Sequence, residues 1–238
     1  MAHSIHSDPG LIGWIPINRL VMNDPFLLSV IELEKTASLR ERMLKAGCVF
    51  EFVVFEPIAE VVVDEHLHRQ ALLGMGHYFG VAYKNPELAR SGGYLPGLYN
   101  PDPELDTDIE RAVATQLSPD EILNLTVVQD CKQGPLELYE AFCNPPHRAR
   151  FKGGEAESQS VFGEWLQLLG IELQDDIVVI NWVSNYETKW MTYDGNPPVE
   201  LPWDDYFSFG LEWWGIWCLT VWNPKKRTLS VLTASTSD

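Results

Sequence analysis

The first chemistry that the sequence suggests is metal binding by two histidines. Asp64 and Glu65 directly precede His66 and His68, and His77 is a candidate third ligand. If this segment is extended, His66 and His68 point to the same face, because the side chains of a strand alternate. Two imidazoles and a carboxylate suit a divalent ion, but a histidine pair without a fixed third ligand is a weak signal. We therefore favour a polar strand end and expect no cofactor.

A second candidate site combines carboxylates with large aromatic side chains. Seven of the nine tryptophans lie between Trp182 and Trp222. The cluster contains, in chain order, Trp203, Asp204, Asp205, Glu212, Trp213 and Trp214. Aromatic rings with a polar edge suit a protein interface or the stacking of a sugar, and two carboxylates about 5–10 Å apart could serve glycoside hydrolysis. The cluster predicts a partner-binding surface or, as the alternative, a hydrolase that uses Asp204, Asp205 and Glu212.

The tryptophans divide into expected core residues and expected surface residues. The run Gly215–Trp222 does not separate an apolar face from a polar one, which indicates a strand buried on both faces. Trp182, Trp217 and Trp222 are therefore predicted core residues. Three others stand beside turns and acids and are expected to be exposed; they are Trp203, Trp213 and Trp214.

An acidic run lies before a predicted helix. Its members are Asp102, Glu104, Asp106, Asp108 and Glu110. Carboxylates in this position complement the positive end of a helix dipole, and that structural role would be sufficient. The spacing of a calcium-binding EF-hand loop is absent. The same carboxylates could also attract a basic partner protein.

Several familiar motifs are absent from the sequence. It has no GxxxxGK[ST], GxGxxG, HExxH, GxSxG or CxxC, which removes the commonest nucleotide-binding, zinc-protease and hydrolase interpretations. The four cysteines are scattered and are expected to be reduced thiols. No export pattern and no apolar run of membrane-spanning length is visible. We expect a cytoplasmic protein that has no membrane partner.

Net charge is the strongest compositional signal. The 238 residues carry a formal net charge of −17. Residues 1–100 contain 11 acidic and 8 basic side chains, whereas residues 101–238 contain 23 and 9. Such a field repels phosphate backbones, so direct nucleic-acid binding is disfavoured, and it attracts basic proteins. Solubility alone is the other explanation of the charge.

These observations favour a non-catalytic, acidic protein-binding protein with a basic protein partner. The most concrete version is an immunity-like or antitoxin-like protein that binds and neutralises a basic toxin or effector. Its predicted partner-binding residues are Asp102, Glu104, Asp106, Asp108, Trp203, Asp204, Asp205, Trp213 and Trp214. Two alternatives remain open, the hydrolase and a structural or assembly subunit that has a large apolar interface.

The elements that must position these residues follow from periodicity and turn signals. Asp24, Pro25 and Gly47 bound a predicted helix over 24–47. Three glycines argue against a regular helix over 66–83. Ser118, Pro119 and Glu121 form a capping box that begins another helix. The other predicted helices cover 106–116, 136–142 and 158–169, and the predicted strands cover 49–55, 59–64, 125–129, 177–183, 215–222 and 228–233.

The order of these elements indicates the fold class. The last two strands read as a hairpin, and hairpins imply antiparallel pairing. The sequence therefore predicts an α+β fold, with a mixed or antiparallel sheet that contains a C-terminal β-hairpin and is packed by several helices. We expect a single compact domain over 1–238. The turn-rich region 84–103 is the candidate internal boundary.

Overall fold

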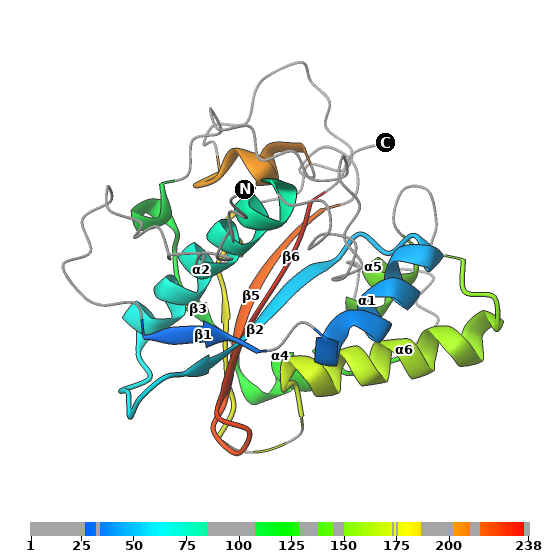
Figure 1. Cartoon of the computed structure of the whole chain (residues 1–238), viewed down its shortest axis with the longest axis horizontal. Coiled ribbons are helices and arrows are strands. Elements are labelled where there is room, and N and C mark those ends of the chain that lie inside the picture. Colours follow the sequence, from blue (N-terminus) through cyan, green and yellow to red (C-terminus); the bar gives the residue numbers. More distant parts are fainter. Residues whose placement is uncertain are drawn as a thin grey trace, which may run out of the picture.

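The computed structural model describes residues 27–31, 34–84, 108–128, 138–144, 150–172, 174, 176–186, 202–209 and 215–235. These residues form one six-stranded antiparallel sheet with helices on both faces (Figure 1). The strand order is β1-β2-β6-β5-β4-β3. The predicted α+β class, with its C-terminal hairpin, is confirmed.

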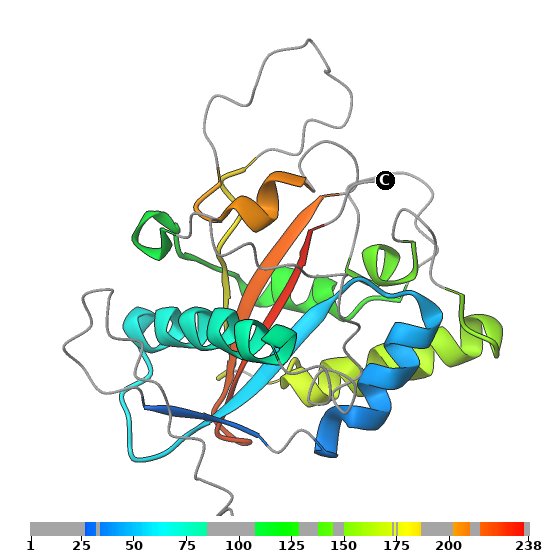
Figure 2. The ribbon, with the colours of Figure 1, turned by 45° about the horizontal axis from the view of Figure 1, so that its top comes forward.

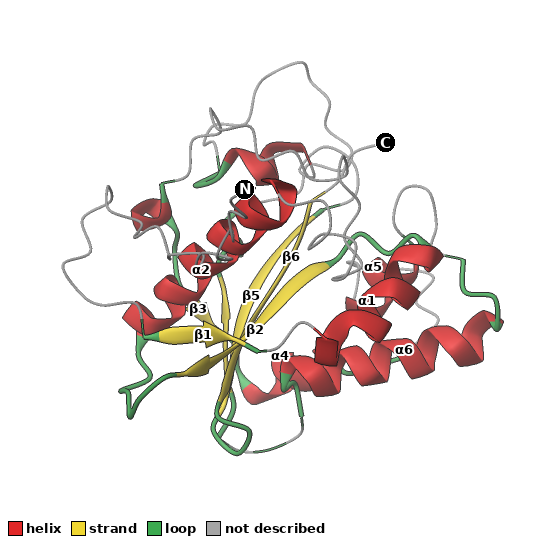
Figure 3. Cartoon of the chain, viewed as in Figure 1, coloured by secondary structure: helices red, strands yellow, loops and turns green. Residues whose placement is uncertain are grey.

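Figure 3 shows the helices in red and the strands in yellow. The strands are β1 (Leu28–Val30), β2 (Glu51–Pro57), β3 (Thr115–Gln116), β4 (Val178–Asn181), β5 (Ile216–Asn223) and β6 (Thr228–Ser235). The helices are α1 (Glu34–Ala46), α2 (Glu65–Lys84), α4 (Pro119–Leu125), α5 (Leu138–Cys143) and α6 (Gly154–Leu169), and the 3-10 turns are η1 (Ile109–Arg111) and η2 (Asp205–Phe209).

The hairpin of β5 and β6 forms the centre of the sheet, with β4 beside β5 and β2 beside β6. Successive residues of a strand point to opposite sides of the sheet, and the residues in the middle of this hairpin are buried on both sides. Leu219 and Val221 pack in one core with α1, α4, α5 and α6. Cys218 packs in a second core with α2 and η2, on the other face. Figure 2 shows these two groups of helices on opposite sides of the strands. The predicted burial on both faces is confirmed for the middle of β5, and Trp182 is a core residue as predicted, whereas Trp217 and Trp222 are only partly buried against the two cores.

Helix α2 corrects the expectation of an irregular segment over 66–83. Its first turn is capped by Asp64, whose carboxylate accepts a hydrogen bond from the Leu67 amide over 3.0 Å. Leu67, Ala71 and Met75 recur every four residues and are buried in the second core. Glycine costs about 1 kcal/mol in a helix interior, and the burial of this apolar face outweighs the cost at Gly74.

Strand β1 and the loop that follows β2 are two further corrections. Leu28–Val30 was expected to lie in the helix over 24–47, but it pairs with the end of β2, where Leu28 faces Pro57. The helix therefore begins at Glu34, and Gly47 ends it with a φ of 88°. The predicted strand over 59–64 is a loop in which Val62 is 81% exposed.

The segment between α2 and α5 is also less regular than predicted. Over 108–116, the predicted helix is reduced to η1 and the edge strand β3. The capping box at Ser118 is confirmed, with Ser118 and Glu121 bonded to each other's backbone amides. No strand forms over 125–128, because Leu125 ends α4 in the core. Residues 85–103, which make up most of the candidate boundary over 84–103, lie outside the described residues.

Helix α6 provides a matched pair of glycines for a stability test. Gly170 ends the helix with a φ of 80°, and a Cβ there would meet the Asn223 Cβ at 2.9 Å. Gly163 lies inside the helix with open space around its Cβ position. We predict that Gly170→Ala lowers the free energy of unfolding by about 1–3 kcal/mol, whereas Gly163→Ala raises it by about 0.5–1 kcal/mol. Urea unfolding of both variants checks this, and equal effects would contradict it.

Candidate protein-binding surface

Two acidic segments that are far apart in the sequence meet in the structure. The Asp108 amide donates a hydrogen bond to the Trp203 carbonyl over 2.8 Å. Asp108 and Glu110 are exposed, and Asp204 and Asp205 are half-buried. We call these four residues the acidic junction, because they lie beside the hydrogen bond that joins the segments leading into η1 and η2. The structure thus brings together four of the predicted partner-binding residues, namely Asp108, Trp203, Asp204 and Asp205.

The remaining residues predicted for this surface, and Glu212 of the hydrolase alternative, lie outside the described part of the chain. They are Asp102, Glu104, Asp106, Glu212, Trp213 and Trp214. Their roles stay predictions. The hydrolase alternative also stays a prediction, because it requires Glu212 beside Asp204 and Asp205.

Trp203 is a buried support of the acidic junction. Only 4% of its surface is exposed, so the expectation of an exposed indole at this position is wrong. Its Nε1 donates to the Trp182 carbonyl over 2.9 Å, and its ring lies 5.0 Å from the Phe207 ring, centroid to centroid. A buried indole N–H needs an acceptor, and this bond fixes the backbone on which Asp204 and Asp205 stand.

Turn η2 is held by two polar bonds near its start. One carboxylate oxygen of Asp204 accepts a hydrogen bond from the Tyr206 amide over 2.8 Å. The Tyr206 hydroxyl accepts one from the Ser235 amide over 3.1 Å, which attaches η2 to the end of β6. Asp204 therefore shapes the turn in addition to charging the surface.

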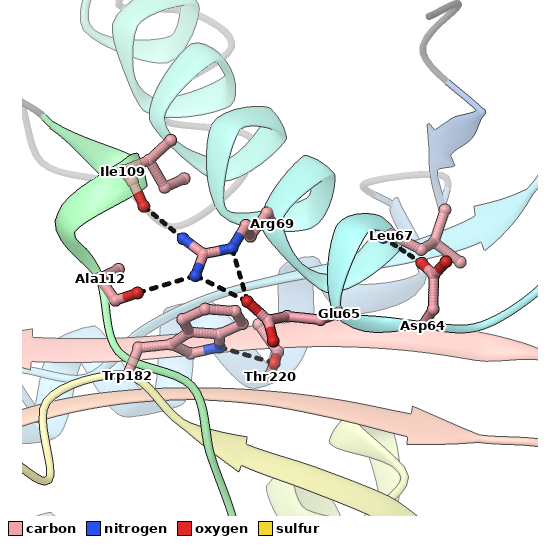
Figure 4. Close-up of polar contacts among 8 residues, drawn as sticks. All are labelled: Asp64, Glu65, Leu67, Arg69, Ile109, Ala112, Trp182 and Thr220. Carbon is pink, nitrogen blue, oxygen red and sulfur yellow. Dashed lines mark hydrogen bonds and ion pairs between the residues drawn. The ribbon is translucent and has the colours of Figure 1, made fainter.

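Arg69 lies at the centre of the contacts that hold η1 against α2. Figure 4 shows its guanidinium between the carbonyls of Ile109 and Ala112 on one side and the Glu65 carboxylate on the other. The bond to Ala112 is 2.8 Å long, and the bonds from Nε and Nη2 to Glu65 are 3.0 and 2.7 Å long. The guanidinium also lies over the Trp182 ring, 5.0 Å from its centroid, a cation–π arrangement.

A buried hydrogen-bond chain continues from Trp182 into the sheet. The Trp182 indole donates to the Thr220 hydroxyl oxygen over 2.8 Å, and that oxygen lies 2.7 Å from Nδ1 of His68. Trp182, Thr220 and His68 are each at most 1% exposed. An indole can only donate, so the Thr220 oxygen accepts from it and the hydroxyl proton is available to His68. The chain joins α2, the residue after β4 and β5 without leaving these polar groups unpaired.

The two histidines of the proposed metal pair do not share a face. Residues 66 and 68 lie in helix α2, where a separation of two positions turns the side chains by about 200°. His66 is exposed, whereas His68 is 1% exposed. The geometric basis of the metal hypothesis is therefore wrong. Within the described residues, no group of three or more His, Cys, Asp and Glu side chains could hold a metal ion.

Burial sets the protonation state of His68. It lowers the pKa of the imidazole to about 4, and the nearby carboxylates of Asp64 and Glu65 oppose this shift only in part. His68 is therefore neutral at pH 7, as its hydrogen bond from Thr220 requires.

Arg69 was missed in the sequence because its signal depends on the helix. Glu65 and Arg69 are four residues apart, a spacing at which opposite charges on a helix pair. The glycines of the same segment argued against a helix, so the sequence did not predict that Glu65 and Arg69 lie side by side. The contacts of Trp182 with Thr220 are long-range and leave no local signal.

Comparisons of this chain with protein-family models, with curated proteins and with solved structures return no match. Across the parts of the chain that the structure describes, no helix has the length and apolar character needed to cross a membrane. The interpretation of the surface therefore depends on its own geometry and charge.

The buried His68 predicts a specific loss of stability in acid. The unfolded chain binds a proton at a pKa near 6.5, whereas the folded chain binds it only near 4. The unfolded state thus gains a proton first as the pH falls. The free energy of unfolding therefore decreases by up to about 3 kcal/mol between these two pKa values. We predict that His68→Asn is less stable than the wild type at neutral pH, and that this difference shrinks as the pH approaches 4.

Urea unfolding between about pH 7 and pH 4 measures this difference, and comparison with the wild type removes the shared titration of the carboxylates. His66→Asn is the matched control, because His66 is exposed on the same helix. A His68→Asn curve parallel to that of the wild type at all pH values would contradict the prediction.

Proposed function

We propose that this chain is a non-catalytic protein-binding protein whose acidic junction docks a basic partner in the cytoplasm. The most concrete form is an immunity-like or antitoxin-like protein that binds and neutralises a basic toxin or effector. The acidic junction would provide the charged part of the interface.

The observation that carries this proposal is the hydrogen bond between the Asp108 amide and the Trp203 carbonyl. It holds two acidic segments next to each other on a chain of net charge −17. Complementary charge of this kind speeds association and selects basic partners. A fixed backbone beneath the carboxylates also lowers the entropy lost on binding.

Two carboxylates of the junction are also open to a partner. Within the described residues, Asp108 and Glu110 are exposed and form no ion pair. Other acids are neutralised by neighbours, since Glu65 pairs with Arg69 and Glu41 pairs with Lys45. An unpaired carboxylate can meet a partner's cation without first losing an internal one.

A charge-reversal experiment tests the proposal. The tagged chain is used to capture basic proteins from a lysate of its own source, with washes at low and high salt. We predict that Asp108→Lys/Glu110→Lys weakens retention of the captured partner by about tenfold or more, because like charges across an interface repel. Association of the wild type should also slow as the salt concentration rises.

The matched control is Asp120→Lys/Asp176→Lys. Both residues are exposed and lie outside the junction, and each double variant removes two acids and adds two lysines, so the net charge changes equally. Loss of the partner in the junction variant alone supports the proposal. Equal effects of the two variants, or none, would contradict it. For the toxin-neutralising form, the captured partner should arrest growth when expressed alone, and only the wild type and the control variant should restore it.

A further inference from the structure

We infer that Arg69 is a positioning residue for the acidic junction, acting on partner binding through the geometry of residues 108–112 and not through contact. This inference rests on the proposed function. It adds a residue that carries the opposite charge to the partner-binding acids and that a search for acidic residues would not select.

The guanidinium is committed to internal partners. It donates to the carbonyls of Ile109 and Ala112, on both sides of η1, and to the Glu65 carboxylate. Its side chain is only 17% exposed, so little of it is available to a partner. Arg69 therefore ties η1 to helix α2 and leaves the surface to Asp108 and Glu110.

These contacts close a ring around the junction. Arg69 lies over Trp182, the Trp182 carbonyl accepts from the Trp203 indole, and the Trp203 carbonyl accepts from the Asp108 amide. Asp108 directly precedes η1, which Arg69 holds at both of its sides. The ring connects both acidic segments to helix α2, and anchoring of this kind preorganises a binding surface.

Lysine cannot reproduce this arrangement. A guanidinium presents five N–H donors in a planar fork, whereas an ammonium is a compact point charge on a flexible stem. Arg69→Lys preserves the net charge but cannot reach both carbonyls and Glu65 in the same geometry. The substitution therefore alters the position of η1 without altering the net charge of the protein.

Hydrogen exchange provides the test that needs no partner. The amides of Asp108, Arg111 and Ala112 are each hydrogen-bonded. In Arg69→Lys we expect their exchange to accelerate by about tenfold or more, because hydrogen bonds to a charged donor are among the stronger ones. The control is Arg42→Lys, which alters another arginine–glutamate pair, with Glu164, on the opposite face of the sheet. It should leave these amides unchanged, and unchanged exchange in Arg69→Lys would overturn the inference.

Binding kinetics test whether this position matters to the partner. With the captured basic protein as probe, Arg69→Lys should raise koff by about tenfold and leave kon and its salt dependence unchanged, since its charge is unchanged. Poly-L-lysine, a probe of charge alone, should bind the wild type and Arg69→Lys equally. An unchanged koff, or an equal loss with poly-L-lysine, would overturn the inference.

The two proposals fail in different ways. If charge reversal at Asp108 and Glu110 has no effect while exchange in Arg69→Lys still accelerates, the proposed function is wrong and this inference falls with it, although η1 is still held by Arg69. If charge reversal abolishes binding but Arg69→Lys binds normally, only the inference is wrong.

A second variant serves if Arg69→Lys does not fold. Glu65→Gln removes one anchor of the guanidinium and keeps both carbonyl bonds, so we expect the amides of residues 108–112 to exchange about threefold faster. Unchanged exchange would overturn the inference.

Discussion

The constraint on which the structure depends is the burial of both faces of the central β5–β6 hairpin. Antiparallel sheets often leave one face to water, but here Leu219 and Val221 enter one core and Cys218 enters the other. Each face therefore requires its own layer of helices. A polar side chain in the middle of such a strand is costly to bury without a hydrogen-bond partner. Thr220 does so through Trp182 and His68, and this need fixes α2 against the sheet.

The acidic junction is a consequence of that attachment. Once His68 holds α2 to β5, the next residue along the helix, Arg69, faces η1 and binds its carbonyls. Trp182 contributes to both steps, because its indole bonds Thr220 and its ring lies under the guanidinium. The surface carboxylates thus stand on a scaffold of buried polar contacts. Their position is determined several residues away from the charges themselves.

The parts of the fold that the sequence predicts are those with a local cause. The hairpin follows from two β-rich runs around a turn, the start of α4 from the capping box at Ser118, and the end of α6 from Gly170. The failures have a non-local cause. Leu28–Val30 forms a strand because it pairs with the free edge of β2. Helix α2 forms in spite of its glycines because its apolar face is buried. For the candidate site, the composition identified the acidic residues. Their proximity depends on a long-range hydrogen bond to Trp203, a residue that the sequence placed at the surface.

A fixed position is what separates a binding surface from charge that only maintains solubility. Solubilising carboxylates need no defined geometry, because repulsion between molecules depends mainly on net charge. Asp204 has a folding role through Tyr206, so its position alone does not indicate binding. Asp108 and Glu110 are different, because their exposed carboxylates have no ion pair among the described residues, although Trp182, Trp203 and Arg69 hold the backbone beside them. Such support beneath two exposed carboxylates is the physical argument behind the proposed binding role.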